Sequence, residues 1–209
     1  MVQAIPATNL SLEYLQEKFN LQRTSNDQFF TEWSTNLVEL SNIEKQTLDR
    51  VKSNYLHLTQ SRPMIESLVQ MVVLSPLLDL AGFYQPPFKV EVEVPVQISI
   101  EDEDEVVQGR IDVLVLRNQL WVLVIESKRG GLSLEPAMPQ ALAYMLANPA
   151  TEKSTFGFIT NGSNFIFLKL SKQGTPQYAY SYEFTLRRGN EDFYNVLSIL
   201  KRLGQLILQ

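Results

Sequence analysis

Three charged side chains stand at the ends of two apolar segments in the middle of the chain. Asp112 lies near the start of the first segment, residues 111–116, whereas Glu126 and Lys128 follow the second, residues 120–125. Burying such charges is costly unless they pair or bind a metal. Two converging carboxylates suit a hard divalent cation such as Mg²⁺ or Mn²⁺, and a lysine beside them could act on a water or neutralise charge on a phosphate. These three residues are therefore the leading candidates for chemistry.

The two apolar segments predict the β-hairpin that would bring these side chains together. Both segments are rich in β-branched and aromatic residues, and the polar residues 117–119 between them are typical of a turn. Because both faces are apolar, we expect central strands covered on both sides. Side chains alternate along a strand, so Glu126 and Lys128 share a face. Asp112 joins them if the loop holds an odd number of residues, whereas a loop of two would send it to the opposite face.

Asp112 followed by Glu126-Ser127-Lys128 resembles the D…(D/E)-x-K signature of the PD-(D/E)XK nuclease superfamily. Residues 66–83 resemble the opening helix of the nuclease domain at the N-terminus of type I restriction enzyme motor (R) subunits. The resemblance covers roughly residues 61–170, although Ile111 stands where the name of the motif has proline. It implies an α/β fold with a restriction-endonuclease-like core, in which helices flank a central mixed β-sheet.

The resemblance also implies a role for each residue of the signature. Asp112 and Glu126, with the main-chain carbonyl of Ser127 as a further ligand, would hold Mg²⁺ or Mn²⁺. Lys128 would orient the attacking water or share the charge of the transition state, and both roles stay open. No cysteine is present, so a cysteine nucleophile is excluded and hydrolysis without a covalent intermediate is expected.

Two further residues enter the candidate site through the same resemblance. Glu66, on the helix before the sheet, would join the metal site, and Gln140 would position water or phosphate, with Tyr144 one helical turn further on. Each has a simpler alternative. An acidic residue in a first turn stabilises the helix dipole, and a glutamine can merely fill a polar helix face.

The remaining elements divide the chain into residues 1–60, a helical extension packed on the core, and residues 61–209, the nuclease domain. Asn9 or Ser11 would cap a helix over 12–19, and a capping box at Ser41 opens a helix to about residue 58. The segment 64–80 predicts a helix that is kinked or broken at Pro76 and ended by Gly82. Further elements are expected as a strand at 89–100 with edge character from Pro95, a helix at 135–147, a hairpin at 156–170, a strand within 177–186 and a final helix after Asn190.

Charge and composition narrow the function classes. The net charge of −5 does not favour a nucleic-acid binder, because phosphate contacts usually require a basic surface. The acids are concentrated, however, and the run at 101–105 predicts a solvated hairpin tip or, alternatively, a metal-collecting or DNA-mimicking loop. The absence of cysteine, the lack of a readable secretion signal and the shortness of the apolar run at 67–78 together predict a cytoplasmic protein outside the membrane.

Two functions of different class therefore stay open. The first is a stand-alone Mg²⁺-dependent DNA endonuclease, because Asp112, Glu126 and Lys128 are all present while no G-x-x-x-x-G-K-[ST] motor motif occurs. It would act on DNA, with room for a homodimer or a separate targeting or motor partner. The second is a non-catalytic module of the same fold that binds nucleic acid or protein, which the acidic balance favours. A plain α/β domain with incidental charges ranks last.

Overall fold

The computed structural model of the chain describes residues 3–100, 105–118 and 120–206. Its strands are β1 (Gln3–Pro6), β2 (Gln22–Arg23), β3 (Phe88–Ser99), β4 (Glu105–Arg117), β5 (Leu120–Ser127), β6 (Thr155–Thr160), β7 (Asn164–Ser171), β8 (Gln177–Tyr180) and β9 (Phe184–Thr185). Its α-helices are α1 (Leu12–Phe19), α2 (Asn42–Leu58), α3 (Glu66–Val69), α4 (Ser75–Leu80), α5 (Met138–Leu146) and α6 (Glu191–Leu206). A π-helical turn, η2 (Gln70–Leu74), joins α3 to α4, and short 3-10 turns are η1 (Ala7–Asn9) and η3 (Glu135–Ala137).

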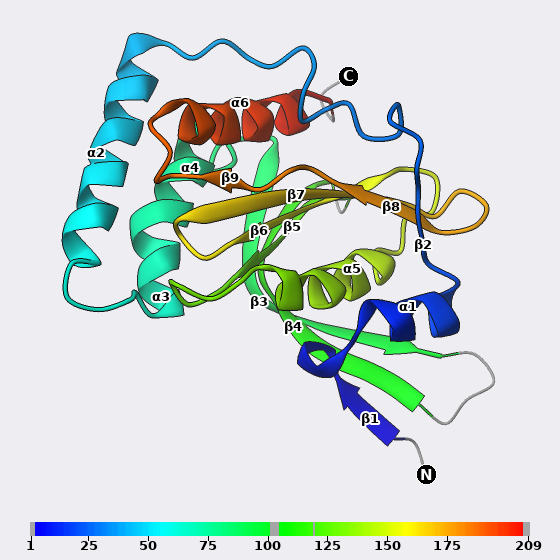
Figure 1. Cartoon of the computed structure of the whole chain (residues 1–209). Helices are drawn as coiled ribbons and strands as arrows, with labels where there is room; N and C mark the ends of the chain where they lie inside the picture. The colour runs from blue at the N-terminus through cyan, green and yellow to red at the C-terminus, as the bar shows by residue number, and fades with distance from the viewer. Residues whose placement is uncertain (1–2, 101–104, 119, 207–209) are drawn as a thin grey trace.

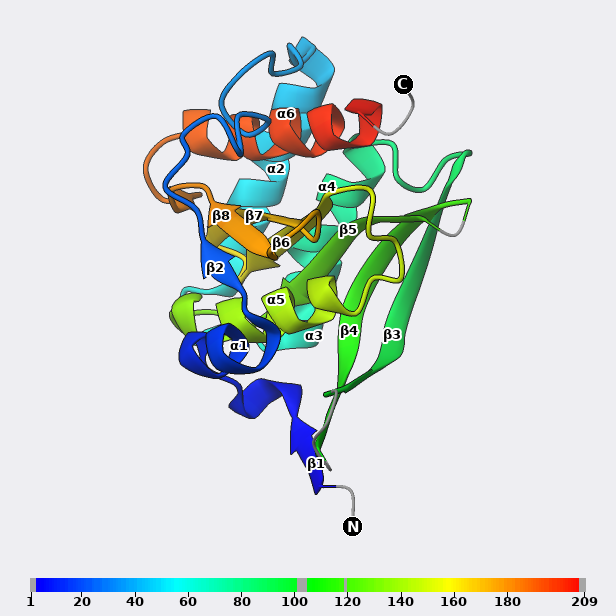
Figure 2. The same cartoon turned by 90° about the vertical axis from the view of Figure 1, so that its right-hand side faces the viewer.

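Over the described residues, nine strands form one mixed sheet in the order β1-β4-β5-β6-β7-β8-β2, with β3 on β4 and β9 on β7. Helices cover both faces of this sheet (Figures 1 and 2). The predicted α/β class, a central mixed sheet flanked by helices, is thereby confirmed. Within the described ranges, no helix is long and apolar enough to cross a membrane.

Two apolar cores lie on opposite faces of the sheet. One contains buried residues of α2, the α3–α4 segment and α6, and the other contains buried residues of α1 and α5. The central hairpin contributes to both, because Val113 and Ile125 pack in the first core and Leu114 and Val124 in the second. The prediction that β4 and β5 are covered on both sides is therefore correct.

The first sixty residues contain both predicted helices and two strands that were not predicted. Helix α1 spans Leu12–Phe19 with Ser11 as its N-cap, and α2 begins with the capping box of Ser41 and Glu44. The strands β1 and β2 are four and two residues long, too short for a readable alternation of side chains. They pair with β4 and β8. The division of the chain at residue 60 stays a prediction.

The helix expected over 64–80 has its irregularity earlier than predicted. It begins at Glu66, passes through the π-helical turn Gln70–Leu74 and continues through Pro76, which lies in the first turn of α4 where a proline is tolerated. The distortion therefore precedes the proline. Gly82, with φ of +85°, follows the end of the helix as predicted. Single π-helical turns inside α-helices are frequent at functional sites.

Strand β3 lies at the edge of the sheet, as the proline in it predicted, and pairs with β4 over nearly its whole length. The other side of β4 has two different partners. It pairs with β1 at residues 105–108 and with β5 at residues 113–117. Residues 109–112 lie at the fork between these two partners. Of the acidic run at 101–105 that was expected to form a hairpin tip, residues 101–104 lie outside the described residues and Glu105 begins β4.

A β-bulge decides the register of the central hairpin. The loop between β4 and β5 holds two residues, which in a regular hairpin would turn Asp112 away from Glu126. However, the register shifts between Val115 and Leu116. Beyond this shift, even-numbered residues of β4 oppose even-numbered residues of β5, so Asp112 reaches the level of Glu126. The expected pairing is present, but the bulge rather than an odd loop produces it.

Candidate active site

Glu126 is the next-to-last residue of strand β5 and is almost completely buried, with 1% of its surface exposed. Its Oε1 accepts a hydrogen bond from the ammonium of Lys128 at 2.5 Å. Its Oε2 is buried and finds no hydrogen-bond partner among the described residues. Burial, followed by the charge of Asp112, raises the pKa of Glu126 to about 8, and the charge of Lys128 offsets only part of this. Glu126 is therefore a buried carboxyl that its protein neighbours do not fully satisfy.

Asp112 is held against the end of β5 by Ser127. Its Oδ2 accepts hydrogen bonds from the main-chain N–H of Ser127 at 2.6 Å and from the Ser127 hydroxyl at 2.7 Å. The same hydroxyl accepts a hydrogen bond at 2.7 Å from Nε2 of Gln70 in the π-helical turn. Burial raises the pKa of Asp112, although the two bonds from Ser127 act in the opposite direction. The register of the hairpin and these bonds together place Asp112 beside Glu126.

The sequence reasoning did not identify Gln70. A signal was present, because Gln70 is an uncharged polar residue in an otherwise apolar stretch and lies one helical turn after Glu66. Its orientation depends on the π-helical turn, which the sequence pattern does not reveal.

Lys128 begins a chain of hydrogen bonds that reaches helix α5. Its ammonium donates to Oε1 of Gln140 at 3.0 Å, and Nε2 of Gln140 donates to the Tyr144 hydroxyl at 3.0 Å. The Tyr144 oxygen also accepts from the main-chain N–H of Arg110 at 3.1 Å. Gly109 allows this approach, because a Cβ there would lie 2.5 Å from the Tyr144 oxygen. Gln140 and Tyr144 therefore belong to the network that contains Lys128.

Glu66 lies in the first turn of α3, partly exposed, and faces a cavity next to Asp112. The cavity has a volume of about 600 Å³ and is lined by Ala4, Pro6, Glu66, Glu93, Gln108, Gly109, Arg110 and Asp112. Burial raises the pKa of Glu66, and the charge of Asp112 adds to the shift. The charges of Glu66 and Asp112 therefore interact, in addition to any interaction of Glu66 with the helix dipole.

The carboxyl groups of the site repel one another, and a divalent cation would relieve this repulsion. Glu66, Asp112 and Glu126 all have raised pKa values, and one buried oxygen of Glu126 has no donor. In the part of the chain that the structure describes, no three metal-binding side chains converge on one point. Mg²⁺ does not require such a cage, because it is usually bound through one or two carboxylates and keeps several waters. Asp112 and Glu126 are the side chains that could hold it.

Comparison with known proteins gives two matches. The model of the family described as "Type I restriction enzyme R protein N terminus" matches residues 15–175, a range that begins within the first sixty residues. A similar solved structure is a fragment assigned to the HsdR subunit of a type I restriction enzyme from Vibrio vulnificus YJ016, with 18% identity and a TM-score of 0.41. The match covers 65% of this chain and 25% of that chain. No curated protein matches this chain.

Proposed function

We propose that this chain, which belongs to the family of type I restriction enzyme R protein N-terminal domains, is a nuclease module that hydrolyses DNA phosphodiester bonds with Mg²⁺ or Mn²⁺. The observation that carries the proposal is the buried Glu126, which lies at the level of Asp112 and has one unsatisfied oxygen while its other oxygen is bonded to Lys128. The chain spans only 25% of the R-subunit fragment that it resembles. A separate motor or targeting partner, a homodimer and a cytoplasmic location stay predictions.

The carboxylates would bind the cation, and the residues around them would keep these carboxylates in position. Asp112 and Glu126 would hold the cation together with the carbonyl of Ser127, whereas Glu66 would join the site through one of the waters that Mg²⁺ keeps. The bound cation would stabilise charge on the scissile phosphate and lower the pKa of a water. Ser127 keeps Asp112 in place through two hydrogen bonds to one oxygen, Oδ2. Asp112 therefore presents a carboxylate whose orientation is set before any ligand binds.

Lys128 fits the role of a donor to substrate rather than that of a base. Burial lowers the pKa of Lys128, but the charge and hydrogen bond of Glu126 together with the charges of Asp112 and Glu66 outweigh this effect, and the net shift is upward. The side chain therefore stays an ammonium at neutral pH. Two of its three N–H bonds are directed to Glu126 and Gln140, and the third can reach a water or a phosphate oxygen. Gln140 holds the ammonium in this position from α5.

The experiment compares cation binding with DNA cleavage. We expect wild-type protein to bind Mn²⁺ or Mg²⁺ in calorimetry and to cleave DNA only when the cation is present. Asp112→Ala should lose both properties. Lys128→Ala should lower cleavage by about 10²-fold or more, because a charge-stabilising donor is removed, while cation binding largely remains.

Lys201→Ala is the matched control. Lys201 is about as shielded as Lys128, with side-chain exposures of 23% and 22%, and it also pairs with a glutamate, Glu44, away from the site. Its cleavage rate should equal that of wild type. If wild type binds no divalent cation, or if the Asp112 and Lys128 variants both cut at the wild-type rate, the chain is instead a non-catalytic module, which the net charge of −5 favours.

A further inference from the structure

The cavity beside Asp112 contains an unusual balance of charge for a site that would receive DNA. Three of its eight described lining residues are acidic, namely Glu66, Glu93 and Asp112, and Arg110 is the single cation among the eight. A DNA backbone phosphate entering this cavity would therefore meet one attractive side chain. Cations at the surface supply most of the affinity of proteins for phosphate.

Arg110 is already paired in the free protein. Its Nη1 lies 3.2 Å from Oε2 of Glu93, and the two side chains are 65% and 61% exposed. Exposed pairs of this kind contribute little net stability, because water solvates both charges well. The guanidinium presents a planar fork that binds the oxygens of a carboxylate or of a phosphate in the same way. A phosphate can therefore displace Glu93 from Arg110 with little loss of free energy.

The main chain holds both partners of this pair in place. Glu93 has φ of +54°, although residues with a Cβ rarely adopt the left-handed region and it lies in the middle of β3. Its neighbours Val92 and Val94 pair with the neighbours of Asp112 on β4, so the distortion occurs directly opposite Asp112. The main-chain N–H of Arg110 is bonded to Tyr144. Local strain of this kind persists where the surrounding structure enforces it, and it is concentrated at functional sites.

We propose that Arg110 binds a backbone phosphate of DNA, and that Glu93 occupies this phosphate position in the free protein until DNA displaces it. The proposal rests on the proposed function, since it names the residue that receives the substrate at the same site. Glu93 acts as a built-in competitor: a ligand must offer Arg110 a stronger anion than one exposed carboxylate. Glu93 lines the same cavity as Glu66 and Asp112, and its charge contributes to the raised pKa values of both.

Removing the charge of Glu93 and removing that of Arg110 should therefore change DNA affinity in opposite directions. Glu93→Gln frees the guanidinium and should tighten binding by about two- to fivefold, in line with the modest strength of an exposed pair. Arg110→Gln should weaken binding by about tenfold and lower the slope of log affinity against log salt by about one, because one phosphate contact is lost. In the double variant, the gain from Glu93→Gln should disappear.

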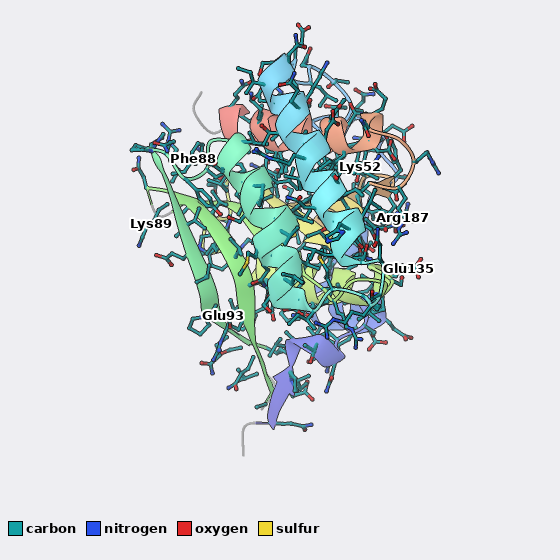
Figure 3. All side chains as sticks on the ribbon, turned by 90° about the vertical axis from the view of Figure 1, so that its left-hand side faces the viewer. Lys52, Phe88, Lys89, Glu93, Glu135 and Arg187 are labelled. Carbon is teal, nitrogen blue, oxygen red and sulfur yellow. The ribbon has the colours of Figure 1, made fainter. Side chains whose placement is uncertain are left out.

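The measurement is fluorescence anisotropy of a labelled DNA duplex with the full chain in EDTA, so that neither cation binding nor cleavage enters the result. Glu91→Gln is the matched control, because Glu91 also lies on β3 and pairs with a cation, Lys89 at 2.5 Å, but does not line the cavity. Figure 3 shows Lys89 near one end of β3 and Glu93 well along the strand from it. Glu91→Gln should bind like wild type. Glu93→Asn removes the charge with a residue that tolerates the left-handed conformation, and it should act like Glu93→Gln.

The outcomes separate this proposal from the nuclease function. If wild type binds DNA but Glu93→Gln and Glu93→Asn do not bind more tightly, the proposal is wrong and the nuclease assignment is untouched. Equal tightening by Glu91→Gln would also overturn it, since general charge would then explain the gain. If the opposite shifts appear but wild type never cleaves DNA with Mg²⁺ or Mn²⁺, Arg110 and Glu93 keep their roles and the nuclease function fails. A wild-type protein that binds no DNA in EDTA overturns this proposal, and the cleavage assay with Mg²⁺ or Mn²⁺ then decides the nuclease function separately.

Discussion

At the scale of single residues, Glu126 shows most directly what the candidate site lacks. Its carboxyl is buried, one of its oxygens has no donor among the described residues, and its pKa is raised to about 8. Lys128 supplies one strong hydrogen bond, but the nearby charge of Asp112 acts against it. Ionisation of Glu126 therefore destabilises the metal-free folded protein, so the free energy of unfolding reports the protonation state of this residue.

We predict that metal-free protein loses stability as the pH rises from about 5 to 8. In this window the folded protein keeps a proton on Glu126 that the unfolded chain, with a pKa near 4.5, releases. The stabilisation is complete below pH 4.5 and is lost as the pH passes the folded pKa, at up to roughly 1.4 kcal/mol per pH unit. Urea unfolding in EDTA at several pH values measures this. Glu126→Gln should flatten the profile, leaving only the smaller slope from Glu66 and Asp112.

Glu44→Gln is the control for this pH dependence. Glu44 is also paired with a lysine, but its pKa is lowered, so it is ionised in both folded and unfolded chains above pH 5. Its loss should lower stability equally at pH 5 and pH 8. A wild-type profile that is flat between these values, or a Glu126→Gln profile as steep as that of wild type, would contradict the assignment.

At the scale of elements, helix α5 completes a sheet that is locally open. Residues 109–112 of β4 lie between the pairings with β1 and β5. The hydroxyl of Tyr144 takes the place of a neighbouring strand there, because it accepts the main-chain N–H of Arg110. It also accepts from Gln140, which holds Lys128. One tyrosine thus connects the fork in the sheet to the candidate catalytic lysine.

We predict that Tyr144→Phe lowers the free energy of unfolding by about 1–3 kcal/mol, because two donors lose their acceptor in a mostly buried setting. Urea denaturation measures the change. Tyr194→Phe serves as the control, since the Tyr194 hydroxyl also makes two hydrogen bonds, to Asp49 and Asn190, but at the surface. It should cost less than about 1 kcal/mol. Equal losses in the two variants would mean that Tyr144 has no special role in holding the fork.

At the scale of the whole molecule, the first sixty residues are built into the sheet. Strands β1 and β2 lie beside β4 and β8, with which they pair (Figure 1). Helix α2 contributes Leu48, Val51 and Tyr55 to one apolar core. An element that shares a core with the rest of the chain gains much of its stability from that contact. The segment should therefore not unfold before the remainder.

The two tryptophans allow a direct test of this cooperativity, because Trp33 lies in the first segment and Trp121 in β5. We predict that the single-tryptophan variants Trp33→Phe and Trp121→Phe show the same cooperative transition in denaturant. Adding Leu48→Ala, at a fully buried position, should lower the stability seen by both probes equally, by about 2–5 kcal/mol. A transition at Trp33 that precedes the one at Trp121 would instead support a separate domain over residues 1–60.

The sequence by itself determined the features that depend on neighbouring residues. The N-cap of α1, the capping box of α2, the apolar hairpin of β4 and β5 and the end of the helix at Gly82 all follow from patterns a few residues long. The residues Asp112, Glu126 and Lys128 could likewise be named in advance, since charges at the ends of apolar strands require an explanation.

Only the tertiary structure decided how these residues meet. A two-residue loop alone would have turned Asp112 away, and the bulge that restores the pairing is one extra residue with no sequence signature of its own. The strands β1 and β2, the contact of Gln70 with Ser127 and the pairing of Arg110 with Glu93 all join residues that lie far apart in the chain or on different strands. Such contacts are set by packing and register across the sheet, and local propensity carries no information about them.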